Sequence, residues 1–335
     1  MGYDVKVKID LTKPIGTVGF GMPMVLVENA EAACAYAEVT NIEEAVKAGI
    51  KNGSNAYKAI RLLFNQAHAP RRIAVCTVTN DAVAALGDAS LAGKGWRQLI
   101  VVNEGETAST PDAISAVVEK MEGKMYFASL NLDDGTAITT TDLRRTVLFY
   151  CDATEDVPVP VAALVGETAG RDAGSFTYKN LVLSGVPAQE LTDSEIDDIH
   201  AKGGITFIQK AGDNVTSEGK VAGGEYIDVV DCKDYIIQQL AYKTQKVLNN
   251  ASKVPYDNNG IGMLESVAVD VLQTAYNNGM IASKTDGTPG YSVNYALRED
   301  TNDTDRANRL YMGGNFSFAL TGAIHTVEVN GEITV

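Results

Sequence analysis

The sequence predicts an α/β fold with mixed sheets flanked by helices, and three observations lead to this prediction. Short apolar runs of strand character recur through the first half of the chain. Segments of about a dozen residues with helical periodicity separate these runs, and caps, prolines and glycines mark the boundaries. Strands that alternate with helices in this way are typical of right-handed βαβ units and a largely parallel sheet.

A strand is expected at the start of the sequence. Residues 3–9 alternate polar and apolar side chains, which places Val5, Val7 and Ile9 on one face of an extended segment. Pro14 then ends the pattern. The opening residues lack the continuous apolar core and the cleavage site of a secretory signal, so we expect synthesis and use in a cytoplasm.

The first half continues with helices that begin at capping residues. Thr40 with Glu43 has the spacing of a capping box, and Ser54 and Thr110 have side chains that cap helix N-termini. Gly123 follows the helix that starts at Thr110, as is usual beyond a helix C-terminus. The expected strands of this region are 72–78, 98–102, 124–130 and 146–151, and a further helical segment is 80–92.

The second half mixes helices with short strands. Thr192 with Glu195 predicts a capped helix, and Gly279 ends a later helix that has a long apolar stripe. Asn330 and Gly331, between two alternating segments, are a strong signal of a β-hairpin. The expected strands are 205–209, 226–230, 323–329 and 332–335, and the expected long helices are 231–250 and 259–278.

The charge balance argues against nucleic acid as a partner. The 335 residues include 28 basic and 43 acidic side chains, and the formal charge of −15 repels phosphate. Residues 190–234 hold eleven acidic residues against four lysines, a balance of −7. We favour a solvated acidic face for this stretch, and a docking face for a basic partner is the alternative.

The sequence carries no signature of a catalytic or metal centre. His68, His200 and His325 are isolated, and the four cysteines lie too far apart for a Cys-x-x-Cys pair or a disulfide framework. The glycines at 16–21 lack the helix start that a dinucleotide fingerprint requires. We therefore predict no catalytic, cofactor-binding or metal-binding residue. No apolar run approaches the ~20 residues needed to span a bilayer.

Several motifs of the second half occur in an order that points to one family. The motif Glu-Thr-Ala-Gly-Arg-Asp-Ala-Gly occupies residues 167–174, and Leu-Ser-Gly-Val ends the segment 180–186. Further segments are 191–205, 216–230, 235–248, 255–279 and the strands that follow 322–325. In their order and spacing these segments resemble the core of contractile phage tail sheath proteins. The resemblance covers the second half well and the first half only by its α/β pattern.

The resemblance implies a structural protein and not an enzyme, without a cofactor. Sheath proteins form stacked hexameric rings around a tail tube, and contraction drives the tube through a target envelope. The implied partners are further copies of the chain, the tail tube protein, the baseplate and the tail terminator, with no direct nucleic-acid contact and no membrane insertion. The implied location is the tail of a virion, where contraction serves genome ejection, or of a tail-like bacteriocin, assembled in the bacterial host cytoplasm.

The resemblance also implies a tail-sheath-like division of the chain. An N-terminal strand arm (1–25) precedes an α/β domain (26–170), a C-terminal α/β sheath domain (171–320) and a C-terminal strand arm (321–335). In the family both arms reach into neighbouring subunits as added strands, a role that suits exposed strand edges. The arm residues by position are Val5, Val7, Ile9, Ile324, Val327, Val329, Ile333 and Val335, and the candidate tube contacts are Arg298, Arg306 and Arg309.

Two other functions stay open from the sequence alone. A cytoplasmic α/β enzyme would bind a small ligand at the carboxyl edge of the sheet, where such folds place their ligands. A non-contractile capsid or adhesion component would share self-assembly but would have a single packing state.

Overall fold

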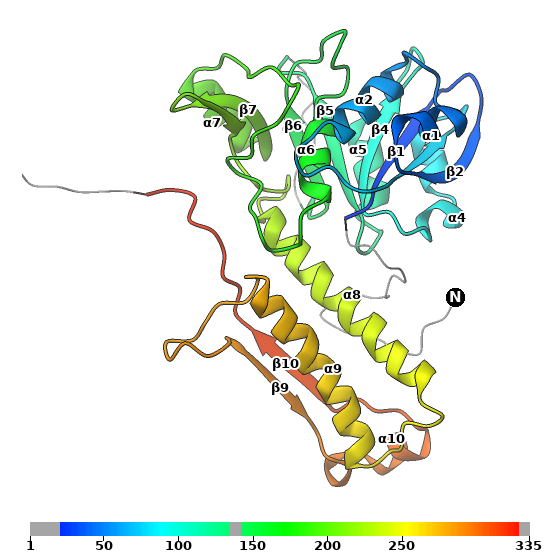
Figure 1. The fold of residues 1–335 in the computed structure, drawn as a ribbon, viewed down its shortest axis with the longest axis vertical. Helices are drawn as coiled ribbons and strands as arrows, with labels where there is room; N and C mark the ends of the chain where they lie inside the picture. The colour runs from blue at the N-terminus through cyan, green and yellow to red at the C-terminus, as the bar shows by residue number, and fades with distance from the viewer. Residues whose placement is uncertain (1–20, 134–141, 328–335) are drawn as a thin grey trace, which may run out of the picture.

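The computed structural model describes residues 21–133 and 142–327, and every structural statement below refers to these residues. The molecule has two parts (Figure 1). A rounded α/β body holds a sheet with helices on both faces, and an elongated helical unit extends away from it. Helix α8 (Ile227–Asn250) begins against the body and continues into the helical unit, beside α9.

The body is built on one eight-stranded sheet with the order β2-β3-β1-β4-β5-β6-β7-β8. The six inner strands are parallel, and β2 and β8 pair antiparallel at the two edges. The predicted largely parallel sheet is confirmed. Its strands are β1 (Pro23–Glu28), β2 (Cys34–Val39), β3 (Ile73–Thr77), β4 (Gln98–Asn103), β5 (Met125–Leu130), β6 (Thr146–Tyr150), β7 (Gly204–Lys210) and β8 (Asp213–Thr216).

Both faces of this sheet are covered by helices, so its inner strands are apolar on both sides. In β1, Val25 and Val27 belong to the core under α1, α2 and α6, while Met24 and Leu26 belong to the core under α3, α4, α5 and α7. The body is therefore a three-layer sandwich. The helices are α1 (Ile42–Lys47), α2 (Asn55–Phe64), α3 (Ala82–Leu86), α4 (Ala89–Ala92), α5 (Pro111–Val118), α6 (Val161–Ala169) and α7 (Asp193–Ala201).

Most of the expected helix starts are confirmed. The side chains of Ser54, Thr110 and Thr192 each accept a hydrogen bond from a backbone N–H in the first turn of their helix. The start expected at Thr40 is displaced by one residue. Asn41 is the cap and accepts the N–H of Glu44, and the Glu44 carboxylate reaches back to Thr40.

Two glycines allow α6 to lie close to α2. A Cβ atom on Gly166 would lie 2.3 Å from the carbonyl oxygen of Leu63, and one on Gly170 would lie 2.1 Å from that of His68. Between them the buried carboxylate of Glu167 contacts His68 Nδ1 at 2.6 Å. The 167–174 motif is therefore part of the packing between these two helices.

The helical unit has its own apolar core. Helices α8 and α9 (Asn258–Asn277) pack side by side, and Gly279, with φ +81°, follows the end of α9 as expected. Strands β9 (Tyr291–Tyr295) and β10 (Gly314–Phe318) form an antiparallel two-stranded sheet that covers one side of α9. A 3₁₀ turn (Arg298–Asp300) and α10 (Asp303–Ala307) form the far tip of the unit.

Residues 226–230 are not a strand, which corrects the sequence prediction. Tyr226 is the N-cap of α8, and Ile227 begins the helix. The β-branched residues of this segment gave it strand character. Ile227 and Val230 are both buried, and their spacing of three places them on the face of α8 that packs against the body.

The body extends further along the chain than the expected boundary at residue 170. Strands β7 and β8 follow that boundary, yet both belong to the same sheet as β1 to β6. The apolar core of the helical unit is formed mainly by α8, α9 and the small sheet. We therefore place the change from body to helical unit at the start of α8.

The arms fall largely outside the described residues. The predicted arm residues that lie outside the described ranges are Val5, Val7, Ile9, Val329, Ile333 and Val335. The hairpin expected at 330–331 also lies outside them. Residues 321–327 are described and belong to no helix or strand of this chain. Over the described ranges, no helix has both the length and the apolar character needed to cross a bilayer.

Candidate assembly site

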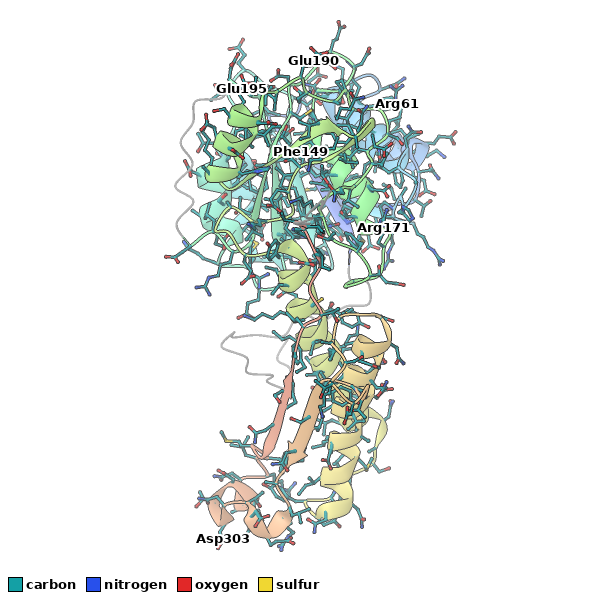
Figure 2. All side chains as sticks on the ribbon, turned by 90° about the vertical axis from the view of Figure 1, so that its left-hand side faces the viewer. Arg61, Phe149, Arg171, Glu190, Glu195 and Asp303 are labelled. Carbon is teal, nitrogen blue, oxygen red and sulfur yellow. The ribbon has the colours of Figure 1, made fainter. Side chains whose placement is uncertain are left out.

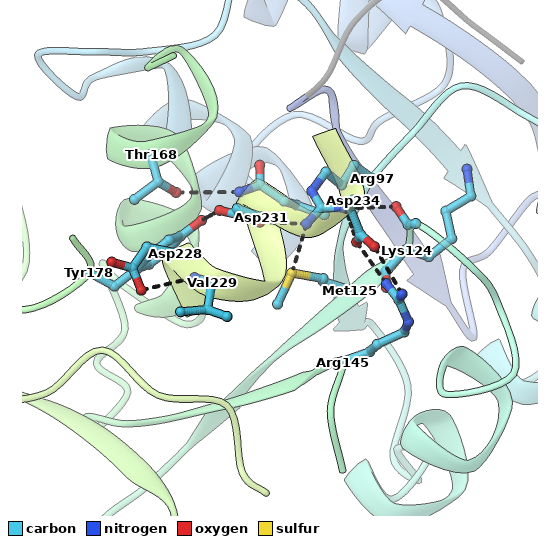
Figure 3. Close-up of polar contacts among 12 residues, drawn as sticks. Arg97, Lys124, Met125, Arg145, Thr168, Tyr178, Asp228, Val229, Asp231 and Asp234 are labelled. Carbon is cyan, nitrogen blue, oxygen red and sulfur yellow. Dashed lines mark hydrogen bonds and ion pairs between the residues drawn. The ribbon is translucent and has the colours of Figure 1, made fainter. Parts of the chain in front are cut away.

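Four buried charged side chains join α8 to the body (Figure 3). Asp231 and Asp234 lie in the first turns of α8, while Arg97 and Arg145 lie just before β4 and β6. Arg97 Nη1 donates to Asp234 Oδ2 at 2.7 Å, and its Nη2 pairs with Asp231. Arg145 donates to both carboxylate oxygens of Asp234, at 2.9 and 3.0 Å. Two guanidinium groups therefore balance two carboxylates inside the molecule.

The electrostatics of this ionic junction act differently on its two carboxylates. Burial would raise the pKa of Asp234, but attraction to Arg97 and hydrogen bonds from both arginines hold that pKa below its usual value. Burial raises the pKa of Asp231, against the opposing attraction of Arg97. The Tyr178 hydroxyl donates to Asp231 Oδ2 at 2.9 Å. Removing one partner of a buried ion pair costs roughly 3–5 kcal/mol because the other charge is left uncompensated, so these four groups restrict how α8 can enter the body.

The acidic stretch 190–234 does not form one solvated face. Asp231 and Asp234, at its end, are buried in the ionic junction, which corrects the expectation for these two residues. Glu190 and Glu195, at its beginning, are exposed at the end of the body that lies furthest from the helical unit (Figure 2). The solvated part of the stretch therefore includes the surface around α7 and the exposed Asp213 and Glu225.

The β9-β10 sheet has two free edges. Each strand pairs along one side only, and no third strand joins them within the described ranges. The side chains that face α9 are only partly buried, because two strands are too narrow to cover their own apolar face. Such an edge, beside a partly covered apolar face, is suited to pairing with an added strand. The partly buried residues are Tyr291, Val293, Tyr295, Phe316 and Phe318.

Exposed large apolar side chains gather in the helical unit and the segment after it. Scattered exposed apolar residues are normal on a soluble protein, but a concentration of them marks an interaction surface. Three of the eleven in the described residues precede α8 or cap it. The other eight are Tyr242, Met263, Val269, Leu297, Leu310, Met312, Ile324 and Val327.

The three candidate tube-contact arginines all lie at the tip of the helical unit, which Figure 2 marks by Asp303. Arg306 braces the tip itself, because its Nη1 donates to the carbonyl oxygens of Arg298, at 3.0 Å, and Thr301, and its Nη2 pairs with Asp303. Arg298 and Arg309 have exposed side chains. The tip therefore presents two of the three arginines outward.

At the carboxyl end of β1, the edge of the body sheet is occupied by contacts within the chain. Glu28, at the end of β1, is buried, and its carboxylate accepts the backbone N–H groups of Ala82 and Ser109, both at 2.8 Å. Asn29 Nδ2 donates to Asn103 Oδ1 at 2.8 Å across the same edge. These contacts occupy the place where an α/β enzyme would bind its ligand. No cluster of three or more metal-ligating side chains occurs in the described ranges.

One functional candidate that sequence reasoning left as an isolated residue is His325. Its imidazole contacts Thr177, Glu218 and Tyr226, which come from three different parts of the chain. The family-like segment that begins at residue 322 includes this histidine. The sequence alone does not predict partners that lie so far away along the chain.

The comparisons with known proteins agree with this architecture. Residues 227–333, which include α8 and the whole helical unit, match the family described as "E217 tail sheath protein gp31-like, C-terminal domain". This region is similar to the C-terminal domain of tail sheath proteins. A comparison by sequence with curated proteins gives no match.

The sheath fold extends over the whole chain. A chain of the anti-feeding prophage baseplate has a TM-score of 0.72 at 15% identity, covering 99% of this chain and 98% of that one. A chain of the contracted helical sheath of the same particle has a TM-score of 0.72 at 14% identity, and the match covers 98% of each chain. A chain of the contracted sheath complex of PVC, an extracellular contractile injection system, has a TM-score of 0.72 at 10% identity. That match covers 99% of this chain and 97% of the other. The expected tail-sheath-like fold is thus confirmed.

Proposed function

We propose that this chain is the structural subunit of a contractile tail sheath. The full-length likeness to subunits of contracted sheaths carries the proposal, together with the family match over the helical unit. Both chains in these comparisons are covered almost completely, so the likeness extends over the body and the helical unit alike. Proteins of the sheath families are structural, and the contacts that occupy the carboxyl end of β1 agree with a non-enzymatic role.

The subunits connect to one another by strand addition. The free edges of β9 and β10 accept an N-terminal or a C-terminal arm of a neighbouring copy. The alternation of Val5, Val7 and Ile9 provides apolar side chains for the partly covered face beside α9. Because donor and acceptor surfaces differ, each contact is heterologous and leads to a ring or a helical stack rather than a closed dimer.

Contraction moves rigid subunits within a connected mesh. The ionic junction fixes α8 to the body, so the body and the helical unit turn together. The arms keep neighbouring subunits joined while the bodies repack. The free energy released is the difference between the two packings.

The partners follow from the same role. Copies of the chain form stacked rings of hexameric symmetry, with Arg298 and Arg309 at the tip directed to a tail tube protein. The stack begins on a baseplate and ends at a tail terminator. The assembly forms in a bacterial cytoplasm and belongs to a phage tail or a tail-like bacteriocin.

Electron microscopy of the purified protein tests this function. We expect tubes or rods, in two lattices of different length and diameter. Deletion of residues 1–20, or truncation before Ile324, leaves the chain folded by circular dichroism but abolishes the tubes. A strictly monomeric full-length chain at high concentration contradicts the proposal, and a single lattice under all conditions favours the non-contractile component instead. A specific metabolite that raises the melting temperature in a thermal-shift screen would favour the alternative function, a cytoplasmic α/β enzyme.

A further inference from the structure

The C-terminal segment reverses the usual relation between polarity and burial. The side chain of His325 is only 10% exposed, whereas Ile324 and Val327 are 85% and 74% exposed. A buried polar residue between exposed apolar ones is informative, because ordinary folding places them the other way round. The imidazole therefore has a specific seat on the protein.

The seat of His325 is built from three separate elements. Its Nε2 lies 2.9 Å from Oγ1 of Thr177, in the loop after α6. Its Nδ1 lies 3.3 Å from Oε1 of Glu218, in the loop after β8. The ring of Tyr226, which caps α8, meets the imidazole edge-to-face with centroids 4.9 Å apart.

The seat has supports that do not depend on the histidine. Glu218 Oε1 accepts the N–H of Gly219 at 2.9 Å, and Lys220 lies 3.7 Å from the other carboxylate oxygen. Lys220 also lies over the ring of Tyr226, 5.0 Å from its centroid. Since these contacts hold Glu218 and Tyr226 in place, the seat can stay formed when the imidazole leaves it.

The rest of the segment is held loosely. The N–H of Thr321 donates to the carbonyl of Met280 at 3.0 Å, and no backbone–backbone hydrogen bond from residues 322–327 occurs in the described part of the chain. Leu320, Gly322 and Ala323 border a pocket of about 180 Å³. Phe176, Cys232 and Met280 also line it. A segment with few contacts opens at low cost. The seated imidazole is therefore its main attachment beyond Thr321.

We propose that His325 is a releasable clasp that sets the free length of the C-terminal arm. This inference rests on the proposed sheath function. With the imidazole seated, the arm is free only beyond residue 325, whereas its release frees the chain from residue 322. The four added residues extend the reach by about 13 Å at ~3.3 Å per residue. One arm can then span two different distances between subunits, as two lattices of different diameter require.

A spin label at the root of the arm tests the clasp. The label is placed at Val327→Cys in a Cys34→Ala background, because Cys34 is partly exposed and the other three cysteines are buried. In the isolated chain we expect a slowly rotating label when His325 is present. We expect a rotation about five- to tenfold faster for His325→Ala, since the hydrogen bond to Thr177 and the contact with Glu218 are lost. His325→Gln, which keeps a polar group able to reach Glu218, is expected to restore part of the slow signal.

Two further variants complete the test. Thr177→Val removes one partner and is expected to mobilise the label, and Thr326→Ala, at an exposed neighbour, is expected to leave it unchanged. Equal mobility of the label in wild type and His325→Ala overturns the clasp. The clasp is also overturned if Thr326→Ala mobilises the label to the same degree as His325→Ala.

The labelled tubes then test release. We expect the label to rotate slowly in one lattice and rapidly in the other. Equal rotational mobility of the label in both lattices overturns the proposal that the clasp opens. The two proposals can fail separately. If neither the wild type nor any variant forms tubes, the sheath function fails. If His325→Ala still mobilises the label in the isolated chain, the attachment of the segment through His325 holds even then.

Discussion

Arg97 and Asp234 are 137 residues apart in the sequence, and their charged groups meet at 2.7 Å where α8 enters the body. The arginine belongs to the β4 side of the sheet and the aspartate to the helix that carries the helical unit. Force applied to the helical unit therefore reaches the sheet through this pair and through Arg145. For a subunit that moves as a rigid body, the strength of this junction is a mechanical requirement.

Substitution of an arginine in the ionic junction should destabilise the protein strongly. Arg97→Met leaves Asp231 and Asp234 buried with less compensation, so we expect a loss of about 3–5 kcal/mol in the free energy of unfolding. Urea unfolding followed by the fluorescence of buried Trp96 measures it. The control is Lys243→Met, which removes a surface pair with Asp270 at 2.6 Å and should cost less than about 1 kcal/mol. Equal losses for both variants would contradict the rigid junction.

The close approach of α6 to α2 gives a second stability prediction. Gly166→Ala places a methyl group against the carbonyl of Leu63, and we expect a loss of about 1–3 kcal/mol because the helices must move apart. Gly262→Ala is the matched control: it also lies in a helix, α9, but nothing lies within 4 Å of its Cβ position. That variant should gain about 0.5–1 kcal/mol from helix propensity. Thermal unfolding that changes in the same direction for both would refute this account.

Local signals in the sequence were reliable where a residue and its partner are neighbours. The caps at Ser54, Thr110 and Thr192 bond to amides three residues away, so their types and spacing predict them. Strand β1 is absent from the sequence prediction because it is buried on both faces and lacks the alternation of a half-buried strand. Proline is tolerated at the first residue of a strand, which is the position of Pro23 here.

The candidate site was less predictable, because its residues act through distant partners. Asp231 and Asp234 look like surface acids in the sequence, and only the fold brings Arg97 and Arg145 to them. The same holds for His325, whose partner Thr177 lies 148 residues earlier. The role of the three arginines at the tip stays a prediction from the family resemblance, whereas the internal bonds of Arg306 follow only from the local loop geometry.

Two buried thiols predict a loss of stability in alkaline solution. Burial raises the pKa of both Cys151 and Cys232 to about 12, above the ordinary value for a thiol. The unfolded chain therefore releases these protons first, so the stability they contribute is complete below about pH 9 and declines as the pH rises toward 12. The decline is about 1.4 kcal/mol per pH unit for each thiol.

The double variant Cys151→Ala/Cys232→Ala isolates this effect, since other groups titrate in the same range. We expect the difference in unfolding free energy between wild type and double variant to be constant from pH 7 to 8 and to shrink between pH 9 and 11, in reducing buffer. A difference that is independent of pH would mean that these thiols ionise equally in the folded and unfolded chains.

A peptide with the sequence of residues 1–20 should block assembly by occupying the free edges of β9 and β10. The edges pair through backbone groups, and the partly covered face with Val293 and Phe316 accepts apolar side chains from one face of the added strand. We expect fewer and shorter tubes in negative-stain images when the peptide is in molar excess. The control peptide has Val5, Val7 and Ile9 replaced by lysine, which keeps the backbone but removes the apolar face, and it should leave tube length unchanged. Equal inhibition by both peptides would mean that the edge does not select the alternating face, and no inhibition by either would place subunit connection elsewhere on the molecule.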